Sequence, residues 1–165
     1  GFAGEPGHMV VDPAGPPCPC GRNGCWERYA SGHGLARLAR LAVDRGDAPG
    51  VLERAGDPDA ISGEHVVAAA RAGDVGAIAV IDELADWLAS GLANLVALLD
   101  PELVLIGGGL ADVADLYLDR ARAAYDTEVF GGAGRTPTRI EVATLGSDAG
   151  AIGAALRVVA PPPER

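Results

Sequence analysis

The sequence predicts an α/β fold with a mostly parallel sheet. From the longest apolar pattern onward, the elements follow in the order helix, strand, helix, strand, helix. The run Leu103–Ile106 is apolar at every position, which is typical of a strand covered on both faces. The chain has 165 residues, 48% of them hydrophobic, so it is long enough to bury a core as one domain.

The segment before Trp26 contains little that could form that core. Residues 1–8 are rich in Gly and Pro and predict a loop, and residues 9–11 are a short strand candidate closed by Asp12-Pro13. Residues 13–24 consist mainly of Pro, Gly and Cys. Such a segment needs a source of order other than apolar packing.

Helical patterns begin at Ser31, a residue type that caps helices. They predict a helix to about residue 43, an irregular connection over 46–59, and a second helix over 62–73. Asp74 then caps the longest helix, 75–99, whose apolar residues recur at three- and four-residue spacing until a proline stops it.

The strand at 103–106 leads directly into three glycines, Gly107-Gly108-Gly109. A helix is predicted at about 113–125, a second strand over 139–145, and a final helix over 148–159 before a short tail. No internal repeat is present in the sequence.

The charge of the chain excludes several classes of partner. Thirteen basic residues, all of them Arg, stand against 23 acidic ones, which leaves a net charge of −10. An acidic chain lacks the basic face that nucleic acid or an anionic membrane surface requires. Without lysine it cannot form a Walker-type nucleotide loop. The apolar stretch 75–99 carries three acidic residues, so we do not expect it to span a membrane.

No secretory signal is recognisable, and the three cysteines do not predict a disulfide scaffold, because they are odd in number and confined to residues 18–25. We therefore expect a cytoplasmic protein. The sequence begins Gly1-Phe2, in what reads as the middle of a loop. We expect it to be a fragment whose upstream part is missing.

The strongest chemical signal is a set of four metal-binding side chains, His8, Cys18, Cys20 and Cys25, in the spacing H-x9-C-x-C-x4-C. Three thiolates and one imidazole suit tetrahedral Zn²⁺, and four protein ligands make such a site structural. The metal would order the loop over residues 12–27. The alternative is three ordinary thiols in a Pro/Gly loop.

Two carboxylates accompany this set. Glu5 precedes His8 by three residues, and Glu27 follows Cys25 by two. Carboxylates accept hydrogen bonds from vicinal hydroxyls, and a metal-bound imidazole has a second ring nitrogen to offer. Glu5, His8 and Glu27 are therefore candidate ligands of a polyhydroxylated substrate. The alternative is that both glutamates simply face solvent.

Glycines at the carboxyl end of a buried strand let a ligand approach the backbone, so Gly107 and Gly108 are candidate nucleotide-binding residues. The pattern is also a common turn, and Asp112 stands where the dinucleotide fingerprint requires its third glycine. His33 and His65 are interpreted as structural histidines of helices.

The blocks Gly4-Glu5-Pro6-Gly7-His8 and Cys18–Glu27 resemble the signature of the ROK family (repressors, open reading frames, kinases). The resemblance continues through residues 29–32, 69–73 and 100–109, and the run Trp26–Ser31 is most similar to actinobacterial glucokinases of that family.

The resemblance implies an actin-like ATPase (sugar kinase, ribonuclease H-like) fold, of which residues 1–165 would be the C-terminal domain. It implies zinc on the four ligands above, sugar hydroxyls on Glu5, His8 and Glu27, and nucleotide against Gly107 and Gly108. The final helix would pack on the N-terminal domain.

The reaction implied is transfer of the γ-phosphoryl group of Mg²⁺-bound ATP to the 6-hydroxyl of glucose or a related hexose. In the family the base is the Asp of an Asn-Asp pair upstream of the zinc loop, and no such pair occurs here. The chain alone is therefore not expected to be a kinase.

Two further interpretations stay open. The same residues occur in the effector domain of sugar-responsive ROK regulators, whose DNA-binding part would lie upstream. The chain could also be a zinc-stabilised assembly module, since the family commonly forms dimers or tetramers and the helix over 75–99 could serve an interface. The preferred hexose is not predicted.

Overall fold

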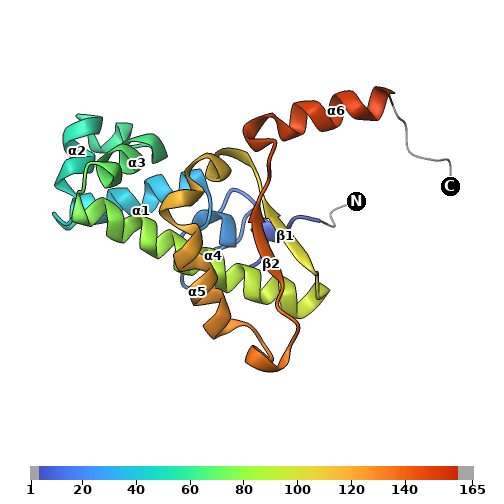
Figure 1. Ribbon diagram of the computed structural model, residues 1–165. Helices are drawn as coiled ribbons and strands as arrows, with labels where there is room; N and C mark the ends of the chain where they lie inside the picture. The colour runs from blue at the N-terminus through green and yellow to red at the C-terminus, as the bar shows by residue number, and fades with distance from the viewer. Residues whose placement is uncertain (1–3, 160–165) are drawn as a thin grey trace.

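The long helix α4, Val75–Leu99, is the centre of the computed structural model, which describes residues 4–159. Helices α1, α3 and α5 pack against it, and a small sheet lies beside its C-terminal half (Figure 1). The predicted three- and four-residue spacing holds in the middle of the helix, whereas Val75, Ile78 and Leu99 near its ends are exposed. The buried face consists of Ala77, Val80, Ile81, Leu84, Ala85, Leu88, Ala89, Gly91, Leu92, Ala93 and Val96. The Asp74 side chain caps the helix by accepting a hydrogen bond from the Ala77 amide, as predicted.

Helices α1, Gly32–Asp44, and α3, Gly63–Arg71, confirm the two helices predicted before α4. The segment predicted to be irregular, 46–59, instead contains helix α2, Pro49–Ala55. Its first turn contains a proline, and Gly56 adopts the left-handed conformation directly after its last residue. These features are typical of the beginning and the end of a helix. The prediction failed because only Val51 of these seven residues is buried, so no apolar periodicity is visible.

Strands β1, Leu103–Ile106, and β2, Arg139–Val142, form a parallel pair in which Leu103 lies opposite Arg139 and Ile106 opposite Val142. The second strand is thus three residues shorter than predicted. The crossover between the strands packs on α4 through helix α5, Leu118–Glu128. Within the described residues, these two strands form a parallel sheet with helices beside it. This arrangement confirms the predicted α/β class.

The helix predicted at 113–125 is divided in the structure. A 3-10 segment, Gly108–Leu116, follows β1, and α5 begins only at Leu118. The backbone of Val113 leaves the helical region at φ −126° and ψ 18°, which breaks the predicted helix near its start. The break places Leu110 and Val113 along the wall of a cavity described below.

Helix α6, Ala149–Val159, extends away from the rest of the molecule (Figure 1), close to the predicted bounds. Its residues from Ala151 to Arg157 are exposed. The predicted packing of this helix on an N-terminal domain concerns residues outside this chain. The predicted tail at 161–165 lies outside the described residues.

The N-terminal loop is held to the core by aromatic side chains. The Trp26 indole donates a hydrogen bond to the Trp87 carbonyl of α4 at 2.8 Å, and Tyr29 stacks on the Trp87 ring with centroids 4.1 Å apart. The Tyr29 hydroxyl donates to Asp12 Oδ2 at 2.7 Å. Arg37 of α1 lies over the other side of this arrangement, 4.7 Å from the Tyr29 ring centroid. The loop is therefore anchored at several points although it has no core of its own.

Among residues 4–159, no helix combines the length and the apolarity that crossing a membrane would require.

The strand candidate at 9–11 is reduced in the structure to a single antiparallel bridge between Val10 and Cys25.

Candidate metal and sugar site

Tight turns bring the four predicted metal ligands together. The Cys18 amide donates to the Arg22 carbonyl at 2.8 Å and the Gly21 amide to the Cys18 carbonyl at 3.0 Å, so that the chain reverses between Cys18 and Arg22. Gly24 adopts φ +65°, and a Cβ there would lie 1.5 Å from the Asp12 carbonyl oxygen. Only glycine allows the two arms of the loop to approach this closely.

The ligand atoms of His8, Cys18, Cys20 and Cys25 all lie within 4.8 Å of one another. Cys20 Sγ and Cys25 Sγ are 3.5 Å apart, and His8 Nδ1 is 3.7 Å from Cys18 Sγ. Cys25 and Cys18 are buried, whereas Cys20 is exposed at the outer side of the cluster. Three sulfurs and one imidazole nitrogen converging on one point fit Zn²⁺ in a closed tetrahedral site.

The three thiols differ in pKa because their surroundings differ. A hydrogen bond with the Arg22 backbone lowers the pKa of Cys20 to about 7, whereas burial raises the pKa of Cys25. A backbone hydrogen bond with Cys20 lowers the pKa of Cys18, but burial and Glu27 outweigh it and the pKa rises to about 12. A metal ion must therefore displace protons from the two buried thiols when it binds.

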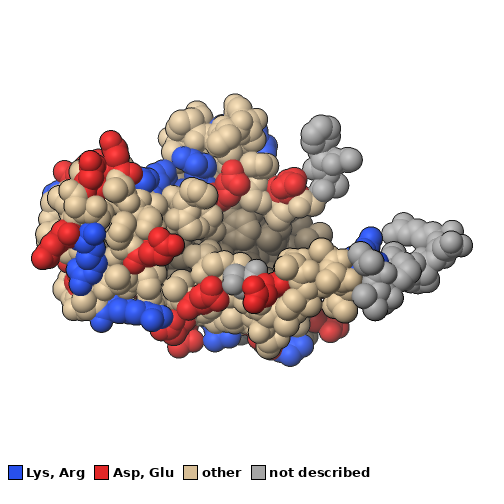
Figure 2. Space-filling model, turned by 90° about the horizontal axis from the view of Figure 1, so that it is seen from above, with Lys and Arg blue, Asp and Glu red and all other residues tan. Residues whose placement is uncertain are grey.

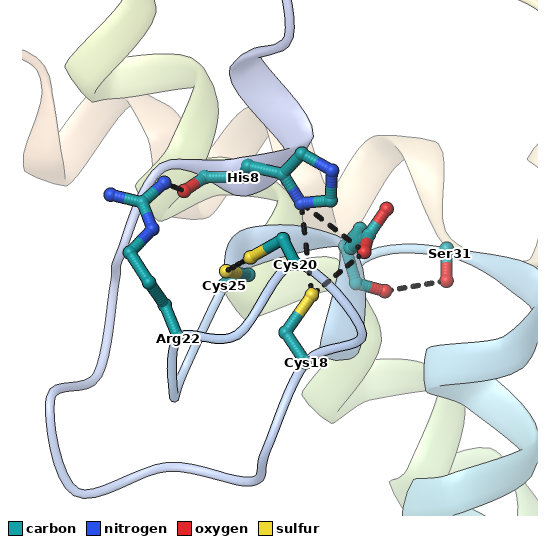
Figure 3. Close-up of polar contacts among 7 residues, drawn as sticks. His8, Cys18, Cys20, Arg22, Cys25 and Ser31 are labelled. Atoms are coloured by element: carbon teal, nitrogen blue, oxygen red, sulfur yellow. Dashed lines mark hydrogen bonds and ion pairs between the residues drawn. The ribbon is translucent and has the colours of Figure 1, made fainter.

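Glu27 contacts two of the four candidate metal ligands. Its Oε1 atom lies 3.4 Å from His8 Nδ1 and accepts a hydrogen bond from the Cys18 thiol at 3.0 Å. The second ring nitrogen of His8 points away from the sulfurs (Figure 3). His8 can therefore face a metal with Nδ1 and a second ligand with Nε2, while 32% of its side chain stays exposed.

Glu5 stands immediately before the short 3-10 turn Pro6–His8, and its carbonyl accepts the His8 amide at 3.1 Å. Its side chain is exposed. The structure thus places all three predicted sugar ligands in one region, with Glu27 and His8 in direct contact and Glu5 joined to His8 through the backbone.

Three further residues support this site, and the sequence predicted a role for only one of them, Ser31, as a helix cap. The Arg22 guanidinium donates to the His8 carbonyl and so ties the two arms of the loop together. The Ser31 hydroxyl donates to the Glu27 carbonyl at 2.6 Å, and the same oxygen accepts the Gly34 amide at 3.0 Å to cap α1. Trp26 separates Cys25 from Glu27 and fixes both on α4 through its indole.

A cavity of about 880 Å³ is linked to this site through Ser31, which lines the cavity and whose hydroxyl contacts the Glu27 carbonyl. The starts of α1 and α3 contribute Ser31, Gly32 and Gly63 to its wall, and Gly107 and Gly109 contribute the opposite side. Gly108, the second predicted nucleotide residue, lies between these two glycines with φ +70° and is not among the described residues that line the cavity. The lining also includes charged residues, Arg40, Glu64 and Arg71, and large apolar ones, Leu35, Ile61, Val67, Leu110 and Val113.

One signal could have identified this cavity from the sequence. Ser31-Gly32 and Ser62-Gly63 are matching Ser-Gly pairs at helix starts, and both border the cavity. His65 completes the cap of α3, because its Nδ1 accepts the Ser62 amide at 3.2 Å, which agrees with its interpretation as a structural histidine. His33 lies on the cavity wall.

The face of the molecule in Figure 2 is hollowed near its middle, with uncharged residues in the hollow and acidic side chains on its rim. Arginine and acidic side chains alternate around this face, and the described residues seen there form no continuous basic patch (Figure 2).

The sequence model of the ROK family matches residues 1–160. The chain belongs to the ROK family. It is 43% identical over 158 residues to a glucokinase of Streptomyces coelicolor, a match that covers 94% of this chain and 50% of the relative. The fold is that of a ROK sugar kinase, which confirms the predicted actin-like class.

Two solved structures illustrate the range of the family. The ROK glucokinase from Streptomyces griseus, in complex with glucose and AMPPNP, superposes with a TM-score of 0.83 at 41% identity, over 93% of this chain and 50% of that chain. A ROK family transcriptional regulator, a homologue of the E. coli MLC protein, superposes with a TM-score of 0.67 at 29% identity, over 84% of this chain and 34% of that one. The chain spans about half the length of the curated relatives it matches first.

Proposed function

We propose that this chain is the C-terminal half of an ATP-dependent sugar kinase of the glucokinase type. One observation carries the proposal. The Ser31 side chain borders the cavity and also donates its hydroxyl to the Glu27 carbonyl at 2.6 Å. A nucleotide in the cavity and a hexose on His8 and Glu27 would therefore be neighbours, as phosphoryl transfer between them requires.

The sugar-binding role rests on the donors and acceptors at the metal loop. The Glu27 carboxylate can accept hydrogen bonds from two vicinal hydroxyls, and Glu5 offers a second carboxylate at the same edge. His8 Nε2 donates in a fixed tautomer once Nδ1 binds a metal. Hydrogen bonds to charged groups are worth about 1.5–3 kcal/mol each, which suffices to select a polyhydroxylated ligand.

The nucleotide-binding role rests on the cavity beside the metal loop. Gly107 and Gly109 leave the backbone bare on one side, so a ligand can lie directly against it. The helix starts at Gly32 and Gly63 direct partial positive charge toward the opposite side. Gly108, between the two bare positions, completes the proposed nucleotide contact. The apolar lining suits the flat face of a base.

Zn²⁺ is the metal that this site would hold, on His8, Cys18, Cys20 and Cys25, and its contribution would be structural. The residues fit the ion by type and by their convergence within 4.8 Å. Elemental analysis after dialysis tests this directly. A zinc content below about half an equivalent per chain contradicts the assignment.

The chain alone is proposed to be inactive. Catalysis would need a carboxylate base and Mg²⁺ on the ATP phosphates, and the family resemblance places the base upstream of the metal loop, outside these 165 residues. What these residues contribute is the position of the hexose and one wall for the nucleotide. Assembly into dimers or tetramers and a cytoplasmic location are further parts of this proposal.

The decisive assay is ATP-dependent phosphorylation of glucose, mannose, N-acetylglucosamine and N-acetylmannosamine by the full-length protein. We expect turnover on one of these sugars, and Glu27→Gln should lower kcat/KM by about ten- to a hundredfold, since one hydrogen bond to a charged group is weakened. Glu53→Gln is the matched control, because Glu53 is exposed on α2 away from the site. Equal losses in both variants would contradict the role of Glu27.

The alternative proposal is the effector-binding domain of a sugar-responsive regulator. It is supported by the likeness to a ROK family transcriptional regulator. Binding of a hexose by calorimetry without turnover on any of the four sugars would favour this alternative over the kinase.

A further inference from the structure

Two of the three thiols in the candidate metal cluster are placed to react with each other. Cys20 Sγ and Cys25 Sγ are 3.5 Å apart, a separation that side-chain rotation can reduce to the bond length of a disulfide, about 2.05 Å. Cys20 is exposed, whereas Cys25 is fully buried directly behind it. A reagent from solvent can therefore reach Cys20, with Cys25 in position to respond.

The third thiol has different partners. Cys18 is 6% exposed, and its Sγ contacts Glu27 Oε1 at 3.0 Å and His8 Nδ1 at 3.7 Å. It therefore faces the proposed sugar ligands on the inner side of the cluster. The geometry separates one reactive pair from one sulfur that stays with His8 and Glu27.

We propose that Cys20 is a reversible oxidation site, at which a peroxide forms a Cys20–Cys25 disulfide and releases the metal from the loop. Gly21 and Gly24, with φ +90° and +65°, form the turns that carry the chain back from one sulfur to the other. The pair is separated by only four residues, so closing the ring requires little movement of the chain.

The chemistry balances with hydrogen peroxide as the oxidant. The Cys20 thiolate attacks one peroxide oxygen, the O–O bond breaks, hydroxide leaves and Cys20 becomes a sulfenic acid. The Cys25 thiolate then attacks the Cys20 sulfur, the S–O bond breaks and a second hydroxide leaves. The two thiolates lose two electrons in total and the peroxide gains them. His8 and Cys18 are then the only cluster ligands left, too few for a closed zinc site.

The consequence for substrate rests on the proposed function. Without the metal, nothing fixes the His8 tautomer or holds the loop beside Glu27, so hexose affinity should fall on oxidation and return on reduction with zinc present. The oxidation itself can be measured without any sugar, so failure of the proposed function and failure of this inference give different results.

The test uses the zinc-loaded full-length protein treated with hydrogen peroxide. A chromogenic chelator follows zinc release, and tryptic peptides prepared without reduction locate the disulfide. Cleavage after Arg22 and Arg28 separates Cys25 from the other two cysteines, so a Cys20–Cys25 bond joins two peptides, and fragmentation at Pro19 distinguishes Cys20 from Cys18. We expect that joined pair, with zinc released in proportion to it and rebound after treatment with dithiothreitol.

Two serine variants complete the test. Cys18→Ser should still form the disulfide, whereas Cys20→Ser should release zinc at least about tenfold more slowly, because it lacks the exposed thiolate. If a variant does not bind zinc, the disulfide identified in the tryptic peptides of the unsubstituted protein decides whether the proposal holds. A disulfide that includes Cys18, sulfinic acid at Cys20 without a disulfide, or retention of zinc in excess peroxide would each overturn the proposal.

Discussion

Gly91 of α4 is a position outside the metal loop at which one added methyl group should disturb that loop. A Cβ built there would lie 1.9 Å from Cε2 and 2.2 Å from Nε1 of the Trp26 indole, against at least 3.4 Å for an ordinary contact. Gly91→Ala must therefore push the indole off α4 and break its hydrogen bond to the Trp87 carbonyl. Because Trp26 lies between Cys25 and Glu27, the displacement reaches both the metal ligand and the proposed sugar ligand.

The magnitude follows from three contributions. Overpacking a close contact costs about 1–3 kcal/mol. The lost hydrogen bond costs about 1 kcal/mol. Alanine regains about 1 kcal/mol because it is the better helix former. The net loss for Gly91→Ala is about 1–3 kcal/mol, which for a chain of this size lowers Tm by about 2–12 °C.

A double-mutant cycle with Trp26→Ala, measured by urea unfolding of the zinc-loaded chain, separates the clash from helix propensity. Once the indole is gone, Gly91→Ala should reverse sign and stabilise the chain by up to about 1 kcal/mol. Gly153→Ala in α6 is the matched control, because no atom lies within 4 Å of its Cβ position, and it should not lower stability or zinc content. A destabilisation by Gly91→Ala that persists in the Trp26→Ala background would refute the reasoning.

Three further perturbations test other contacts. Gly24→Ala would place its Cβ against the Asp12 carbonyl and should abolish stoichiometric zinc in elemental analysis. Gly21→Ala shares the strain of a positive φ but meets no atom within 4 Å, so it should lower the zinc content less. Burial, followed by Asp12, raises the pKa of Tyr29 from 10 to about 12, so the stability that this group contributes is complete below pH 10 and is lost as the pH rises toward 12. Tyr29→Phe should flatten that alkaline loss in urea unfolding and cost about 1 kcal/mol at neutral pH, and an unchanged alkaline profile would argue against this assignment. Arg40→Met removes three hydrogen bonds from the guanidinium to carbonyls of the turn before α3, and should weaken ADP binding in calorimetry several-fold, since that turn borders the cavity.

The metal cluster could be predicted from the sequence because its information is local. Cys18, Cys20 and Cys25 lie within eight residues, and the glycines between them permit the turns that such a spacing requires. The helices of the core could also be predicted where the apolar periodicity extends over many residues, as in the 25 residues of α4. A strong pattern repeated over many turns leaves few alternative conformations.

The cavity could not be predicted in the same way. Its walls come from Gly32, Gly63 and Gly107, which are far apart in the sequence and meet only after α1 and α3 have packed on α4. Helix α2 was missed for a related reason, since a helix with a single buried residue leaves no periodic signal. Predicted elements were wrong or incomplete where the contacts that define them are few or distant.

The proposed sharing of His8 between a metal and a substrate would explain why a site of this kind is built on a loop without a core. A loop rich in Pro and Gly can follow the close turns that bring four ligands together, but apolar packing cannot hold its polar side chains in a fixed direction. A metal held by the four candidate ligands would fix those directions, and if it bound Nδ1 of His8 it would leave Nε2 as a donor of one tautomer. The Trp26 indole links the loop to α4 through its hydrogen bond to the Trp87 carbonyl. The Ser31 hydroxyl links Glu27 to the start of α1, which borders the cavity. The metal would thus govern both halves of the proposed site while contacting neither the hexose nor the nucleotide.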